Sequence, residues 1–75
     1  MERYKNLNND SGVSAFEIAN DSITVDFSDG ASYLYTYASA GSYNIEQMKK
    51  LAVIGRGLNA FINLNVRKKY LRKFR

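Results

Sequence analysis

The residue types of this sequence favour binding over catalysis. Its 75 residues include no His and no Cys, the side chains that most often supply a nucleophile or a base near neutral pH. The seven carboxylates show no recognisable pairing, and a chain without cysteine has no thiolate ligand for a metal. We therefore expect no catalytic residue, no metal site and no cofactor.

Basic residues are concentrated in the last third of the chain. Residues 1–48 carry all seven acidic residues and two basic ones, a net charge of −5, whereas residues 49–75 carry nine basic residues and no acid, a net charge of +9. Six of these nine lie within residues 67–75. Cations at this density bind polyanions by neutralising backbone phosphates. The candidate phosphate contacts are Lys49, Lys50, Arg56, Arg67, Lys68, Lys69, Arg72 and Lys73.

The tail at residues 66–75 interleaves these cations with apolar side chains. Val66, Tyr70 and Phe74 recur every four residues, which predicts the end of a helix with one apolar stripe. Three interpretations of its cations remain open: a phosphate-binding helix, a solvated helix end that complements the helix dipole, and an amphipathic helix lying on anionic membrane. Phosphate binding is favoured over the membrane, because the core needs the apolar stripe.

Tyrosines at alternate positions are candidates for stacking on nucleic-acid bases. They are Tyr33, Tyr35 and Tyr37. A two-residue turn at 29–30 would expose them, whereas a three-residue turn over 28–30 pairs Tyr33 with Val25 and directs the tyrosines into the core. We expect the buried orientation, because a domain of 75 residues needs that apolar area.

The elements that carry these residues are predicted from hydrophobic spacing. Alternating apolar and polar residues predict a three-stranded antiparallel meander after a loose polar lead-in over residues 1–12. The strands are expected around residues 16–18, 23–27 and 32–37. Asn20-Asp21 suits a two-residue hairpin loop, which pairs Ile18 with Ile23 and Phe16 with Val25.

Helical spacing replaces the alternation after residue 44. Asn44 with Gln47 three residues later has the form of a capping box, and Gly55 and Gly57 end this first helix. A second helix is expected to run from Leu58 through the basic tail. The fold class is α+β, with the order β-β-β-α-α in a single domain over residues 13–75.

The order of several short motifs resembles a known family. They are Val25-Asp26-Phe27 before Gly30, the Tyr33-Leu34-Tyr35 pair of tyrosines, and Gly57-Leu58-Asn59 with Ile62 and Tyr70 downstream. Over about residues 13–70 this order is similar to the KTSC domain, found at the C-terminus of some lysyl-tRNA synthetases and in small single-domain bacterial proteins. The resemblance implies a small α+β domain, and the synthetase association implies RNA as a partner. It does not extend to the basic tail.

These observations predict a non-catalytic module that binds nucleic acid, RNA rather than DNA, with weak sequence preference. The charge supplies phosphate contacts, and no motif reads base edges. A cytoplasmic location without a membrane partner is expected, because no apolar run approaches the length of a membrane span or forms a signal peptide. The alternative function is a protein-interaction or homodimerisation module that uses a sheet edge or an exposed tyrosine face.

Overall fold

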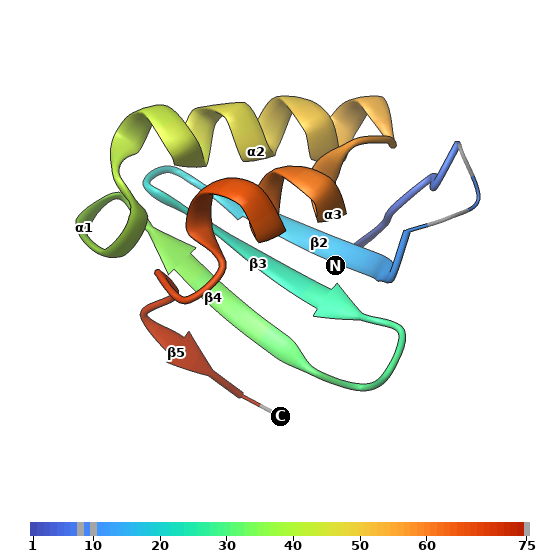
Figure 1. The fold of residues 1–75 in the computed structure, drawn as a ribbon, viewed down its shortest axis with the longest axis horizontal. Helices are drawn as coiled ribbons and strands as arrows, with labels where there is room; N and C mark the ends of the chain where they lie inside the picture. Colours follow the sequence, from blue (N-terminus) through green and yellow to red (C-terminus); the bar gives the residue numbers. More distant parts are fainter. Residues whose placement is uncertain (8, 10, 75) are drawn as a thin grey trace.

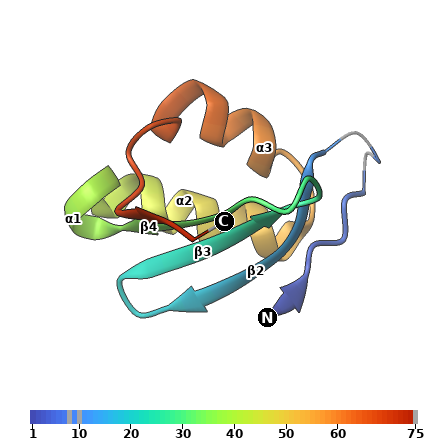
Figure 2. The ribbon, with the colours of Figure 1, turned by 90° about the horizontal axis from the view of Figure 1, so that it is seen from below.

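The computed structural model describes every residue except Asn8, Asp10 and Arg75. The described residues form two layers, a five-stranded antiparallel sheet and a helical layer on one face of it (Figures 1 and 2). The strands lie in the sheet in chain order: β1 Glu2–Arg3, β2 Val13–Ala19, β3 Ser22–Phe27, β4 Ser32–Thr36 and β5 Arg72–Lys73. The helices are α1 Tyr37–Ala40, α2 Ser42–Ile54, α3 Leu58–Phe61 and the π-helical η1 Ile62–Val66. The α+β class is thus confirmed, with two more strands than predicted.

The first hairpin has the predicted register. Ile18 lies opposite Ile23, and Phe16 lies opposite Val25, across the β2–β3 pair. Phe16, Ile23 and Val25 are buried, whereas Ile18, near the hairpin loop, is 41 % exposed. The strand pairing therefore follows directly from the alternation of apolar residues and the two-residue loop.

The turn between β3 and β4 determines which face of the sheet the tyrosine side chains of β4 occupy. The Phe27 N–H donates to the Ala31 carbonyl oxygen at 2.8 Å, which leaves three residues in the loop, and Gly30 there has a φ of +97°. This register places Tyr35 opposite Ile23, and only 1 % of the Tyr35 side chain is exposed. The predicted register is confirmed and Tyr35 is buried, but Tyr33 is only partly buried, and Tyr37, in α1, is exposed.

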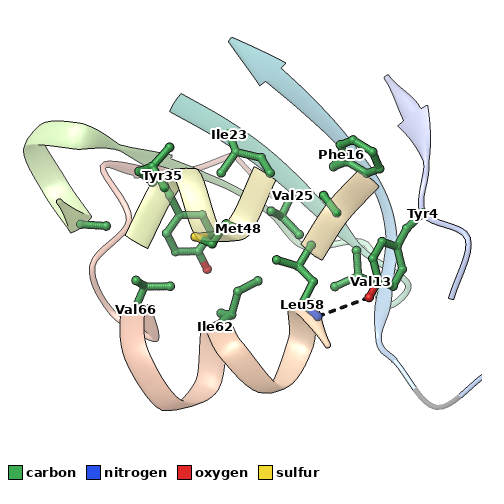
Figure 3. Packing of buried hydrophobic residues seen from close by; sticks show 13 residues of the cluster. Tyr4, Val13, Phe16, Ile23, Val25, Tyr35, Met48, Leu58, Ile62 and Val66 are labelled. Atoms are coloured by element: carbon green, nitrogen blue, oxygen red, sulfur yellow. Dashed lines mark hydrogen bonds between the residues drawn. The ribbon is translucent and has the colours of Figure 1, made fainter. Parts of the chain in front are cut away.

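The prediction of a loose lead-in is wrong for residues 2–7. β1 pairs with β2, and Tyr4 is buried with its hydroxyl accepting a hydrogen bond from the Leu58 N–H at 3.3 Å (Figure 3). The Leu7 N–H donates to the Gly55 carbonyl oxygen at 2.7 Å. One aromatic anchor and paired backbone groups thus fix a segment whose composition resembles that of a loop.

The capping box occurs in a different helix from the one predicted. α2 begins at Ser42, and the Asn44 amide, now inside the helix, donates to the Ala40 carbonyl oxygen at 2.9 Å. The Thr36 hydroxyl instead accepts from the Ser39 N–H at 3.0 Å, and the Ser39 hydroxyl accepts from the Thr36 N–H at 3.0 Å. This reciprocal pair starts α1, so β4 ends one residue earlier than predicted and Tyr37 is helical.

The predicted helix through the basic tail is wrong beyond Val66. α3 and η1 continue to that buried residue, whose carbonyl oxygen then accepts from the Lys69 N–H at 2.8 Å in a turn. The chain returns to the sheet, where the Leu71 N–H donates to the Leu34 carbonyl oxygen at 2.7 Å and β5 pairs with β4 (Figure 1). This pairing satisfies backbone groups that β4 would otherwise present as an open edge.

The hydrophobic core lies between the sheet and the helices (Figure 3). Its largest fully buried side chains are Tyr35, Phe16, Ile23, Ile45, Met48, Leu58, Val25 and Val66. They come from β2, β3, β4, α2, α3 and η1, so each of these elements is fixed by packing as well as by hydrogen bonds. Within the described chain, no helix is long and apolar enough to cross a membrane.

Candidate nucleic-acid interface

An aromatic pocket of about 330 Å³ opens between the β3–β4 end of the sheet and η1. Its lining residues are Phe27, Asp29, Ala31, Tyr33, Tyr35, Ile62, Asn63, Arg67, Lys68 and Tyr70. Four aromatic rings thus share one hollow with two cations, one carboxylate and one amide. The volume falls at the lower end of the range for small-ligand sites.

Tyr33 is the centre of the aromatic cluster. Its ring centroid lies 4.8 Å from that of Tyr70, 5.6 Å from that of Phe27 and 6.3 Å from that of Tyr35. All three separations suit favourable ring contacts. Tyr70 belongs to the segment between η1 and β5, so the returning tail supplies one wall of the pocket.

The Tyr35 hydroxyl is the polar end of a largely buried side chain that lines the pocket. It points from β4 toward η1, where Ile62 and Val66 lie (Figure 3). No described residue makes a hydrogen bond with this hydroxyl, although the atom is not sealed inside the core. Burial raises the pKa of Tyr35 to about 12, with smaller contributions from Tyr33 and Tyr70. The hydroxyl therefore keeps its proton at neutral pH and can donate it to a ligand.

A group of five cations follows η1, and two of them, Arg67 and Lys68, line this pocket. We call the group the tail cations. They are Arg67, Lys68, Lys69, Arg72 and Lys73, all exposed. Among the residues that the structure describes, none of the five forms an ion pair. Binding of an anion therefore breaks no existing ion pair at these side chains.

Strand pairing directs the last two tail cations to opposite faces of the sheet. Lys73 lies opposite Tyr33, and its ammonium is 5.6 Å from the centroid of that ring, on the pocket side. Arg72 lies opposite Leu34, and its guanidinium is 6.0 Å from the Phe74 ring centroid. Lys73 thus extends the cationic rim of the pocket, whereas Arg72 faces away from it.

Lys49 and Tyr37 form a separate structural cluster. The Lys49 ammonium lies 2.9 Å from Glu46 Oε2 and donates to the Asn20 carbonyl oxygen at 2.8 Å, while the Tyr37 hydroxyl donates to Glu46 Oε2 at 2.6 Å. The bonds from Lys49 and Tyr37 lower the pKa of the Glu46 carboxyl, and the bond to Glu46 raises the pKa of Tyr37. These two predicted site residues connect α1, α2 and the β2–β3 hairpin and do not line the pocket.

Lys50 and Arg56 also lie away from the aromatic pocket. Lys50 is on α2, beside the exposed Val53 and Ile54. Arg56 is in the turn before α3, and Arg67 follows η1, so a helical segment on the order of 10 Å long separates these two cations. The predicted phosphate contacts are thus divided between the tail cations and three residues elsewhere.

Several pocket residues have no role in the sequence prediction. Phe27 is predicted to lie in a strand and belongs to a motif of the family resemblance, and Asp29 is predicted to lie in a turn. Neither position indicates that α3–η1 packs nearby. Asn63 is next to Ile62 of the predicted apolar stripe and belongs to no motif in the sequence. Tyr70 was placed on a helical stripe, although its place in the family resemblance was a second signal for a distinct role.

Comparisons with models of protein families, with curated proteins and with solved structures found no match. The similarity to the KTSC domain therefore rests on the motifs in the sequence alone. In the described part of the chain, no cluster of three acidic side chains is placed to hold a metal ion.

Proposed function

We propose that this protein is a non-catalytic module of the cytoplasm that binds single-stranded nucleic acid, RNA rather than DNA, with weak sequence preference. The observation that supports it most is that two of the tail cations, Arg67 and Lys68, line an aromatic pocket. Cations and rings at one place match the two chemical parts of a nucleotide, its phosphate and its base. The choice of RNA follows from the resemblance to the KTSC domain.

The phosphate contacts come from the tail cations. Arg67, Lys68 and Lys69 are consecutive and exposed in the turn after η1. Each phosphate that they neutralise releases bound counterions, which makes affinity fall steeply as the salt concentration rises. Charge contacts of this kind carry no sequence information, so the preference among sequences is weak.

The base contacts come from the rings that the pocket leaves accessible. Tyr33 and Tyr70 are only partly buried, and both line the hollow next to Arg67 and Lys68. A base stacked on an aromatic side chain contributes about 1–3 kcal/mol, and every base presents a face for such contact. Single strands offer unpaired bases, whereas a duplex keeps them stacked in its interior.

Fluorescence anisotropy with labelled oligonucleotides of one length tests the proposal. We expect single-stranded RNA to bind more tightly than duplex RNA, and its affinity to fall as salt is raised. A chain that binds neither form at low salt would overturn the proposed function. Equal affinity for single-stranded RNA and DNA would remove the choice of RNA only.

A homodimerisation module is the second candidate. Val53 and Ile54 are 55 % and 49 % exposed, and with Lys49 and Lys50 they line an apolar hollow on α2. Exposed aliphatic side chains that adjoin one another are a feature of interaction surfaces. Sedimentation that depends on protein concentration, together with no affinity for nucleic acid, would favour this candidate.

A further inference from the structure

The unpartnered hydroxyl of Tyr35 gives the aromatic pocket a chemical preference. The Tyr35 residue is 1 % exposed and lines the pocket, and its hydroxyl has no hydrogen bond with any described residue. Among the described residues no fully buried side-chain polar atom lacks a partner, so this hydroxyl reaches the surface of the pocket, where a ligand can contact it. Phenylalanine at this position would supply the same ring without a hydrogen-bond donor. The hydroxyl therefore points to a ligand that enters the pocket.

The surroundings of this hydroxyl define the chemistry of the ligand. The rings of Tyr33 and Tyr70 stand 4.8 Å apart at their centroids and make the nearby walls apolar and aromatic. The exposed Arg67 and Lys68 line the same hollow, so an anionic group belongs at its mouth. A flat ring with an acceptor atom on its inner edge and a phosphate on its outer side satisfies all three features.

We infer that the aromatic pocket receives one base of the bound strand, and that the Tyr35 hydroxyl donates a hydrogen bond to a ring carbonyl oxygen of that base. This inference rests on the proposed function and adds base recognition at a single nucleotide position. Uracil, cytosine and guanine carry a carbonyl oxygen that projects from the ring, whereas adenine has only ring nitrogens as acceptors. The pocket thus prefers a carbonyl-bearing base.

Tyr35→Phe is the matched variant for this inference, because it removes the hydroxyl and keeps the ring. The hydroxyl has no partner within the described protein, so its loss is expected to leave the free energy of unfolding unchanged or slightly raised. Urea unfolding of the variant checks this point. Tyr37→Phe is the control, since its hydroxyl bonds to Glu46 at 2.6 Å and does not line the pocket.

The binding experiment uses three single strands of about eight nucleotides, a length within the range that small domains cover. One strand carries uracil, one carries adenine, and one carries abasic tetrahydrofuran units with the same number of phosphates. In the wild-type protein, we expect the uracil strand to bind about tenfold more tightly than the abasic strand. We expect Tyr35→Phe to lower the affinity for the uracil strand by about fivefold and to leave the affinity for the abasic strand unchanged. Tyr37→Phe should change neither.

The comparison between the two proteins removes differences that belong to the strands themselves. Adenine strands stack on themselves in solution, so only the change caused by Tyr35→Phe is compared between bases. If Tyr35→Phe lowers the affinity for the adenine strand as much as the affinity for the uracil strand, the preference for a carbonyl-bearing base is overturned. An abasic strand that binds as tightly as the uracil strand would overturn the inference while leaving phosphate binding in place. Failure of all three strands to bind the wild-type protein would overturn the proposed function itself.

Discussion

Gly55→Ala tests the contact between the N-terminal segment and the turn that follows α2. A Cβ atom added at Gly55 would lie 2.6 Å from the Cβ of Lys5, much closer than van der Waals contact allows. Gly55 also ends α2 with a φ of +93°, a conformation that costs a residue with a side chain about 1–2 kcal/mol. Two separate penalties therefore meet at this one position.

Gly30→Ala separates these two penalties. Gly30 has a φ of +97°, and an added Cβ there meets no atom within 4 Å. We expect Gly30→Ala to lower the free energy of unfolding by the backbone term alone, about 1–2 kcal/mol. Gly55→Ala should lower it by about 1–3 kcal/mol more, because the clash forces either the turn or the segment around Lys5 to move.

Urea unfolding followed by far-UV circular dichroism measures both variants. The excess cost of Gly55→Ala should shrink in a Lys5→Gly background, since that change removes the clashing Cβ, and a double-mutant cycle isolates this coupling. Equal costs for Gly55→Ala and Gly30→Ala, with no coupling to Lys5, would show that the N-terminal segment does not rest on the turn.

Three further predictions concern hydroxyl groups. Tyr4→Phe should lower the free energy of unfolding by about 1–2 kcal/mol in the same assay, because the buried Leu58 N–H loses its acceptor. Thr36→Ala should lower it by about 1 kcal/mol through loss of the α1 capping box, and Thr36→Ser should retain most of this stability. Burial raises the pKa of Tyr35 from 10.0 to about 12, so the unfolded chain loses this proton first. Stability should therefore fall between pH 10 and about 12, and Tyr35→Phe should reduce that fall; an identical pH profile for the variant would contradict the assignment.

The central meander was predictable because its signals are local and agree with one another. A two-residue loop at 20–21 and the alternation around it set the same register for β2 and β3. The three-residue turn before β4 was a choice between two registers, and the need for buried area selected the observed one. Here sequence spacing and core packing pointed to the same structure.

The tail was not predictable because its structure depends on contacts far along the chain. The spacing of Val66, Tyr70 and Phe74 fits a helix, yet the Phe74 N–H donates to the Ser32 carbonyl oxygen at 2.7 Å. No local pattern at residues 67–74 indicates that β4 has a free edge at which the tail can pair. The non-local pairing outweighs the local helical preference.

The candidate site was predictable in its charge and not in its shape. Composition identified the tail cations, but the pocket beside them forms only because the turn at 67–69 brings Tyr70 to Tyr33. The ion pair of Lys49 with Glu46 could be predicted locally, because Glu46 precedes Lys49 by three residues on the same helix. Its bond to the Asn20 carbonyl oxygen, across the β2–β3 hairpin, had none.

The salt dependence of RNA affinity in two charge-matched double variants tests the proposed interface most directly. Lys68→Gln with Lys69→Gln removes two tail cations, and Lys50→Gln with Arg56→Gln removes two charges away from the pocket. Each lost phosphate contact should reduce the slope of log affinity against log salt by about 0.7 for a single strand, so the tail variant should lose about 1.4. The other variant should keep the wild-type slope. Equal slopes in both variants would contradict an interface located at the tail.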